Sequence, residues 1–68
     1  MITQEQWVQL GFLPADFRFS QNRFGLWPSE AHPGRWWIAI APELHLLLKQ
    51  YSTREEAEAA LVALRLLQ

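Results

Sequence analysis

The sequence contains no cysteine, which excludes both a disulfide framework and a zinc site built from thiolates. Its 3 glycines are isolated, so it has no glycine-rich loop of the kind that holds nucleotide phosphates. No apolar run approaches the roughly 18 to 20 residues that a membrane span needs, and the first residues lack the basic and apolar regions of a secretory signal. We therefore expect a cytoplasmic protein that has no cofactor, makes no contact with a membrane and is stabilised by packing alone.

What the chain does have is a large apolar fraction for its size. With 68 residues it is too short for two independent domains, so we predict one domain over residues 1–68. Hydrophobic residues make up 50% of the chain and tryptophan occurs 4 times, a content typical of a packed core. The formal net charge of −1 provides no general attraction for nucleic acid. Residues 18–42 are mildly basic and hold most of the aromatic side chains.

Capping residues and apolar spacing predict a helix at each end of the chain. Thr3 and Gln6 have the spacing of a capping box, and Gly11 supplies a stop, which indicates a short amino-terminal helix. Ser52 and Thr53 begin two overlapping capping boxes, and apolar residues then recur at helical spacing. These residues are Ala57, Ala60, Leu61, Leu64 and Leu67. We predict a carboxy-terminal helix over residues 53–67 that packs this stripe on a sheet.

Residues 17–27 form an aromatic stretch that is interrupted at residues 20–22, and we expect the first strand within it. The interruption fits either a tight turn or a bulge in one long strand. The segment from Trp27 to Gly34 is rich in proline and polar residues. It is predicted to be a loop, the natural place in a small domain for contact with a partner.

Alternating apolar residues predict a hairpin with strands over residues 35–41 and 44–51. An odd number of loop residues would place the even-numbered side chains on one apolar face. A two-residue loop would instead pair Ile40 with His45 and mix the faces. Sorting by hydrophobicity favours the odd loop, so Trp36 is predicted to lie inside and Trp37 on the opposite face.

Together these elements predict an α+β fold. It consists of a small three-stranded antiparallel sheet packed against a C-terminal helix, with a short N-terminal helix. The sheet face opposite the C-terminal helix is the predicted partner-binding surface, because aromatic anchors with a basic rim are favoured in protein interfaces. Its predicted residues are Trp27, Arg35, Trp37, His45, Leu47 and Lys49. In a second arrangement the N-terminal helix folds over this face and buries Trp37 with Trp7 and Phe12, and both arrangements fit the sequence.

Catalytic and metal-binding readings have weaker support. Ser29, Glu30 and His32 supply a hydroxyl, a carboxylate and an imidazole, the groups that acyl transfer uses. A short proline-rich loop offers them little rigid support, so we interpret them as a solvated loop and predict that the protein is not an enzyme. The 2 histidines have no cysteine and no recognisable ligand spacing beside them, so no metal site is predicted.

One segment resembles a known family. Tyr51-Ser52-Thr53-Arg54-Glu55-Glu56-Ala57 follows the hairpin and leads into an alanine-rich helix. It is similar to the strand-to-helix junction of AP2-like DNA-binding domains, including the arm-binding modules of phage-type integrases, and SPOR-type domains show a similar junction. The resemblance covers roughly residues 34–64. AP2-like strands present basic and polar residues to DNA, whereas these read Ile-Ala-Ile-Ala and Leu-His-Leu-Leu-Leu, so the resemblance implies the local fold and not the binding residues.

The expected function is non-enzymatic binding to a surface of a larger protein. A symmetric dimer through the exposed sheet edge or the tryptophan patch is a further expected form. In its brevity and its lack of catalytic residues the chain is similar to small phage or mobile-element products that inhibit host proteins. The alternative is a nucleic-acid-binding module in which Arg18, Arg23 and Arg35 neutralise phosphates while neighbouring aromatic rings stack on bases.

Overall fold

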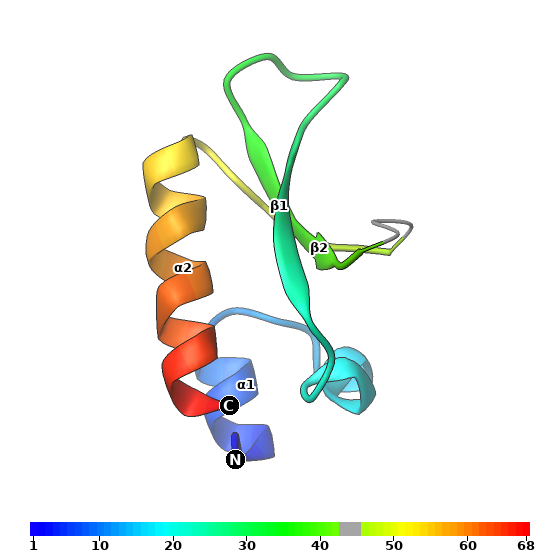
Figure 1. Ribbon diagram of the computed structural model, residues 1–68, viewed down its shortest axis with the longest axis vertical. Helices are drawn as coiled ribbons and strands as arrows, with labels where there is room; N and C mark the ends of the chain where they lie inside the picture. Colours follow the sequence, from blue (N-terminus) through cyan, green and yellow to red (C-terminus); the bar gives the residue numbers. More distant parts are fainter. Residues whose placement is uncertain (43–45) are drawn as a thin grey trace.

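The computed structural model describes residues 1–42 and 46–68, and the chain adopts a small α+β fold (Figure 1). Its elements in chain order are α1 (Gln4–Gln9), the 3-10 helix η1 (Pro14–Phe19), β1 (Phe24–Pro28), β2 (Trp36–Ile40), β3 (Leu47–Tyr51) and α2 (Arg54–Leu67). Figure 1 shows α2 running along one side of the sheet, with α1 beside its carboxy-terminal end. The predicted three-stranded sheet and both predicted helices are confirmed.

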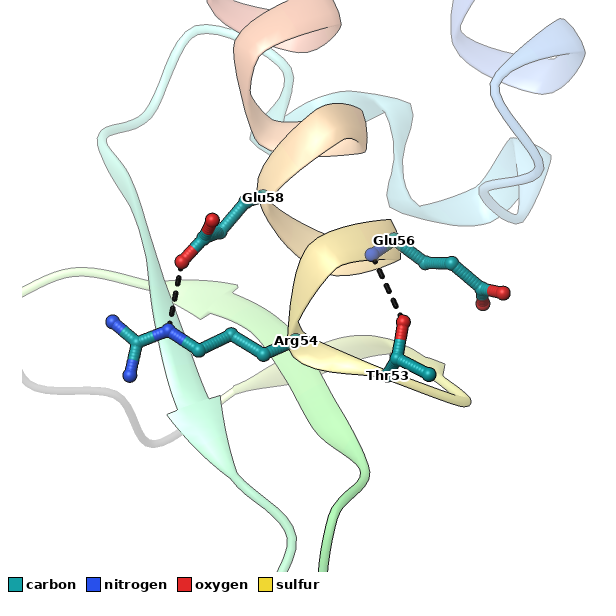
Figure 2. A network of polar contacts seen from close by, with 4 residues as sticks. All are labelled: Thr53, Arg54, Glu56 and Glu58. Atoms are coloured by element: carbon teal, nitrogen blue, oxygen red, sulfur yellow. Dashed lines mark hydrogen bonds and ion pairs between the residues drawn. The ribbon is translucent and has the colours of Figure 1, made fainter.

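Both helix starts use the capping residues that the sequence indicates. At α1 the Thr3 hydroxyl accepts the amide of Gln6, and the Gln6 side chain accepts the amide of Thr3. At α2 the Thr53 hydroxyl accepts the amide of Glu56 at 3.1 Å (Figure 2). Gly11 follows the end of α1 with a φ of 98°, a left-handed conformation that favours glycine.

The first strand is shorter than the aromatic stretch that predicted it. Residues 17–19 of that stretch belong to η1, which begins at Pro14, a residue that suits the first turn of a helix because it has no amide hydrogen to donate. The amide of Ser20 donates to the carbonyl of Phe17, and that of Asn22 donates to Phe19. The interruption at residues 20–22 is therefore a turn that separates η1 from β1, and not a bulge within one strand.

The sheet is an antiparallel meander in the order β1-β2-β3, so β1 and β3 are its edges. Strand β1 pairs with β2 without interruption, from Phe24 opposite Ile40 to Pro28 opposite Trp36. At the turn end of the second hairpin, Ala39 lies opposite Leu47 and the amide of Ile40 donates to the carbonyl of Leu46. This register confirms the prediction of an odd number of connecting residues.

A bulge in β3 then changes the register. Ile38 lies opposite Lys49, so Leu48 is an extra residue between two consecutive pairs. Beyond the bulge, Trp36 pairs with Tyr51 and Trp37 pairs with Gln50. The predicted alternation of even-numbered side chains on β3 therefore holds only up to the bulge.

One core cluster joins the helices to a single face of the sheet. It contains Ile2, Trp7, Phe12, Phe24, Ile38, Leu48, Leu61 and Leu64. Polar contacts fix the end of α2 to the start of β1, because Arg65 donates to the carbonyl of Phe24 and Gln68 donates to the carbonyls of Ser20 and Asn22. Among the described residues, all sheet members of this cluster lie on the α2 side of the sheet.

Candidate functional site

The two adjacent tryptophans of β2 point to opposite faces of the sheet. Trp37 lies directly opposite Trp27 of β1, one residue out of phase with the Ile38–Leu26 pair that faces α2. Trp27 is 39% exposed, and Leu47, on the same face through its pairing with Ala39, is 40% exposed. We call these three side chains, Trp27, Trp37 and Leu47, the aromatic face.

The first tryptophan, Trp36, lies on the α2 side as predicted, but at its margin. It is partly buried, and the guanidinium carbon of Arg54 lies 4.5 Å from its ring centroid. This cation–π contact covers one indole with a side chain from the first turn of α2. One side chain of the same molecule therefore already covers the Trp36 ring.

The amino-terminal helix does not cover the aromatic face. Trp7 and Phe12 belong to the core cluster together with Ile38 of the sheet and Leu64 of α2. Because this cluster lies on the α2 side, the arrangement in which α1 buries Trp37 is wrong. The helices α1, η1 and α2 all pack in one apolar layer on the α2 side of the sheet. No helix in the described part of the chain covers the other side.

A pocket of about 540 Å³ opens beside the aromatic face. It lies between the sheet and the loop that connects β1 to β2. Its lining consists of Trp27, Pro28, Ser29, Glu30, Ala31, His32, Trp37, Leu47 and Gln50. Two indoles and a leucine supply an apolar wall, and the loop supplies polar groups, a composition that suits recognition of a ligand or a side chain.

Three hydrogen bonds, two of them partly buried, hold the loop beside this pocket. The hydroxyl of Ser29, which is buried, accepts the backbone amide of His32 at 3.2 Å and the side-chain amide of Gln50 at 3.2 Å. The guanidinium of Arg35 donates to the carbonyl oxygen of the Gln50 side chain at 3.4 Å. Gln50 thus connects the edge strand β3 to both ends of the loop, which makes the pocket part of the fold.

The same bonds weaken the catalytic reading of the loop. The Ser29 hydroxyl already accepts two donors, so it holds a turn and has no base directed at it. His32 and Glu30 are exposed and make no side-chain hydrogen bond to other described residues. Within residues 1–42 and 46–68, no three acidic or histidine side chains come close enough to hold a metal ion.

Lys49 does not lie on the predicted surface, so its prediction as a rim residue is wrong. Its partner across the ladder is Ile38, which is buried toward α2. Its ammonium group lies 5.0 Å from the ring centroid of Tyr51 and against Gly11. The bulge at Leu48 turns Lys49 to the helix side and puts Gln50 in its place beside Trp37.

Four of the other predicted residues lie on or beside one surface. Trp27, Trp37 and Leu47 come together on the aromatic face, and Arg35 lies at its border through the contact with Gln50. His45 lies outside the described residues. Sequence reasoning missed Gln50, because strict alternation places it on the helix side, and it also missed Pro28. The sequence indicates Glu30 only as a member of the solvated loop with Ser29 and His32.

The arginines of the nucleic-acid alternative do not gather on one surface. Arg23 precedes β1 and Arg35 precedes β2, and because the strands are antiparallel these positions lie at opposite ends of the sheet. The ends of a five-residue strand are roughly 13 Å apart. Arg18 lies over Phe19 of η1 at 4.7 Å, and Arg23 lines a separate pocket of about 590 Å³ with Arg65.

Comparisons with protein-family models, with curated proteins and with solved structures give no match to this chain. None of the helices in the described part of the chain is long and apolar enough to cross a membrane. The hairpin followed by a helix that the sequence predicts is observed, in the order β2-β3-α2.

Proposed function

We propose that this protein is a non-enzymatic binding module that acts by placing its aromatic face against a larger protein. The observation that carries this proposal is the pairing of Trp27 with Trp37 on a sheet face that lies outside the core cluster. Tryptophan is among the side chains most enriched at the centres of protein interfaces, where its large surface is desolvated. A single exposed apolar side chain is ordinary, whereas a cluster of large ones marks a candidate interaction site; here Trp27 and Leu47 are exposed and Trp37 is half-buried between them.

The surroundings of the aromatic face resemble the anatomy of an interface. Leu47 extends the apolar centre, and Arg35, Gln50 and Ser29 supply a polar border whose hydrogen bonds are already made. Preformed bonds of this kind lower the cost of ordering the surface on association. An inhibitor of the phage or mobile-element type would act in this way, by occupying a surface that its target needs.

Self-association is the second form of the same proposal. The strands β1 and β3 are both edges of the sheet, and an exposed edge can pair with that of a second copy. A symmetric dimer would then bring two aromatic faces together. The solution mass, measured by light scattering at several concentrations, separates this form from binding to a different protein.

Nucleic-acid binding is favoured less, because the three arginines that would carry it lie on separate parts of the molecule and the net charge is −1. Such a module would show retention on DNA or RNA that falls steeply with salt and weakens when Arg18, Arg23 or Arg35 is replaced. Retention of that kind, unchanged by Trp37→Ala, would contradict the proposal.

The decisive experiment measures partner affinity with matched variants. The protein is used to capture a partner from a cognate lysate, the partner is purified, and its dissociation constant is measured for each variant. Trp27→Ala and Trp37→Ala should each weaken binding by about tenfold or more, since central tryptophans are frequent hot spots. The matched control is Leu66→Ala, because Leu66 is an apolar side chain on α2 that is 82% exposed.

Thermal unfolding of the same variants separates a binding effect from a folding effect. Leu66→Ala should leave both affinity and the thermal midpoint unchanged. Trp37→Ala should leave the midpoint within a few degrees of the wild type while affinity falls. If Leu66→Ala weakens binding and the tryptophan variants do not, the interface lies on α2 and the proposal is wrong.

A further inference from the structure

The pocket beside the aromatic face has an unbalanced charge. Of the described side chains that line it, Glu30 is the one that carries a full charge at neutral pH, and neither a lysine nor an arginine is among them. Glu30 is exposed, and the single ion pair among residues 1–42 and 46–68 joins Arg54 to Glu58 on α2. The carboxylate of Glu30 is therefore open to a cation from outside.

The aromatic rings of the pocket are also open to a cation. Elsewhere in the molecule, charged groups cover rings: Arg54 lies over Trp36, Arg18 over Phe19, and Lys49 over Tyr51, at 4.5, 4.7 and 5.0 Å. In the part of the chain that the structure describes, no cation lies over Trp27 or Trp37. These two indoles are the best cation–π acceptors of the aromatic face, because tryptophan has the strongest face among the aromatic side chains.

Arg35 lies at the border of the aromatic face, and its contacts direct it away from the pocket. Its guanidinium donates to Gln50, and its backbone amide and carbonyl bond to His32 and Ser29. It closes the base of the loop and is not part of the pocket lining. The indoles and the carboxylate are thus left for a group that the chain does not supply.

We infer that this pocket receives an arginine side chain of the partner, with the guanidinium stacked on an indole of the Trp27–Trp37 pair and donating to the carboxylate of Glu30. The inference rests on the proposed function, because it assigns a chemistry to the same surface. Arginine fits better than lysine, since its planar group stacks on an aromatic ring and pairs with a carboxylate at the same time. A quaternary ammonium ion would satisfy the rings but could donate no hydrogen bond to Glu30.

The test uses the purified protein and short probes, so it needs no partner. The indole N–H signals of Trp27 and Trp37, assigned with single Trp→Phe variants, are followed by NMR during titration with an acetylated and amidated Gly-Arg-Gly peptide. Matched peptides carry citrulline, lysine or trimethyl-lysine in place of arginine. We expect saturable shifts of both signals with the arginine peptide, and binding weaker by at least about threefold with each other peptide.

Two variants with the same change of charge locate the site. Glu30→Gln should weaken binding of the arginine peptide by at least about threefold, whereas Glu55→Gln, on the exposed side of α2, should leave it unchanged. Equal binding of the arginine and citrulline peptides would overturn the inference. So would equal effects of the two variants, or tighter binding of lysine or trimethyl-lysine.

The outcomes also keep this inference apart from the proposed function. If the partner depends on Trp27 and Trp37 but the arginine peptide does not bind, the aromatic face is an interface and its pocket does not select a guanidinium. If the peptide binds as expected but the partner ignores both tryptophan substitutions, the pocket is correctly assigned and the proposed function is wrong.

Discussion

Trp7 stacks on Phe12, with ring centroids 4.3 Å apart and an angle of 21° between the ring planes. The same indole lies 6.4 Å from the ring of Phe17 and 6.1 Å from that of Phe24, and its N–H donates to the carbonyl of Leu13 at 2.9 Å. One fully buried side chain thus connects α1, η1 and β1. Its hydrogen bond satisfies a polar group that would otherwise be buried without a partner.

Trp7→Phe should lower the free energy of unfolding by about 2 kcal/mol, because it removes this hydrogen bond and leaves a void beside Phe12. In a domain of 68 residues such a loss corresponds to a drop in the thermal midpoint of roughly 8 to 16 °C. Trp27→Phe makes the same chemical change at an exposed position and should cost less than about 0.5 kcal/mol. Equal costs in urea denaturation would mean that Trp7 does not hold the three elements together.

The start of α2 offers a test of which predicted cap is used. Thr53→Ala should cost about 1 kcal/mol because its hydroxyl accepts the amide of Glu56, whereas Ser52→Ala should cost almost nothing (Figure 2). The two substitutions remove the same hydroxyl group one residue apart, so each serves as the control for the other. Thermal denaturation measured by circular dichroism gives both values. A larger loss of stability for Ser52→Ala would show that Ser52, and not Thr53, caps the helix.

The neighbouring ion pair should contribute little by comparison. The Nε atom of Arg54 lies 2.7 Å from Oε1 of Glu58, but the two side chains are 55% and 51% exposed, so water and salt screen the attraction. Glu58→Gln should therefore cost less than about 0.5 kcal/mol, an effect that vanishes in 1 M salt. Arg54→Ala should cost more than Glu58→Gln, because the guanidinium also covers Trp36. Equal losses in salt titrations of both variants would contradict a role for that stacking.

The features that the sequence predicted well depend on neighbours in the chain. The caps at Thr3 and Thr53 and the apolar stripe of α2 involve residues within one or two turns of each other. The opposite placement of Trp36 and Trp37 follows from the geometry of an extended strand. Local spacing is sufficient for such predictions, and the place of Trp37 on the aromatic face followed from it, whereas the pairing of Trp27 with Trp37 comes from the register of β1 and β2.

The bulge in β3 depends on tertiary packing, and for that reason alternation alone failed there. Leu48 and Tyr51 are three residues apart, so a regular strand would send them to opposite faces. The extra residue lets both pack toward α2, which buries two large side chains instead of one. The same shift moves Lys49 out of the candidate site and Gln50 into it. The available sequence signal for the bulge was the odd spacing of two large side chains, Leu48 and Tyr51, within one strand.

The two glycines with positive φ provide a further prediction. Gly11 has a φ of 98° and Gly34 a φ of 91°, so alanine at either position should cost about 1 to 2 kcal/mol in backbone strain. A Cβ at Gly34 would meet no atom within 4 Å, whereas a Cβ at Gly11 would meet the ammonium group of Lys49. Gly11→Ala should therefore cost about 0.5 to 1 kcal/mol more, the size of the contact between Lys49 and Tyr51.

A double-mutant cycle shows whether this excess comes from Lys49. In a Lys49→Ala background, Gly11→Ala and Gly34→Ala should have the same cost, because the side chain that a Cβ would displace is gone. Chemical denaturation of the six variants, including the wild type, provides the values. If Gly11→Ala still costs more than Gly34→Ala without Lys49, the extra cost comes from the backbone around Gly11.

The burial of Tyr51 should lower the stability of the protein at high pH. Burial disfavours its charged form and raises the pKa of its hydroxyl from 10.0 to about 12, and the oxygen has no hydrogen-bond partner within the described part of the chain. The unfolded chain releases this proton near pH 10, whereas the folded chain retains it until about pH 12. Stability is thus complete below pH 10 and falls as the pH rises from 10 to 12. The full shift corresponds to about 3 kcal/mol, and solvent screening of this half-buried residue reduces the expected loss to about 1 kcal/mol.

Tyr51→Phe isolates this contribution from the other groups that ionise at high pH. The variant keeps the ring in the core and under Lys49, but it removes the buried hydroxyl. At pH 7 it should be as stable as the wild type or up to about 1 kcal/mol more stable, because no hydrogen bond is lost and a desolvated polar atom is removed. Between pH 9 and 12 its free energy of unfolding should fall less steeply than that of the wild type. Parallel curves for the two proteins in urea denaturation would show that Tyr51 ionises as readily in the folded chain as in the unfolded one.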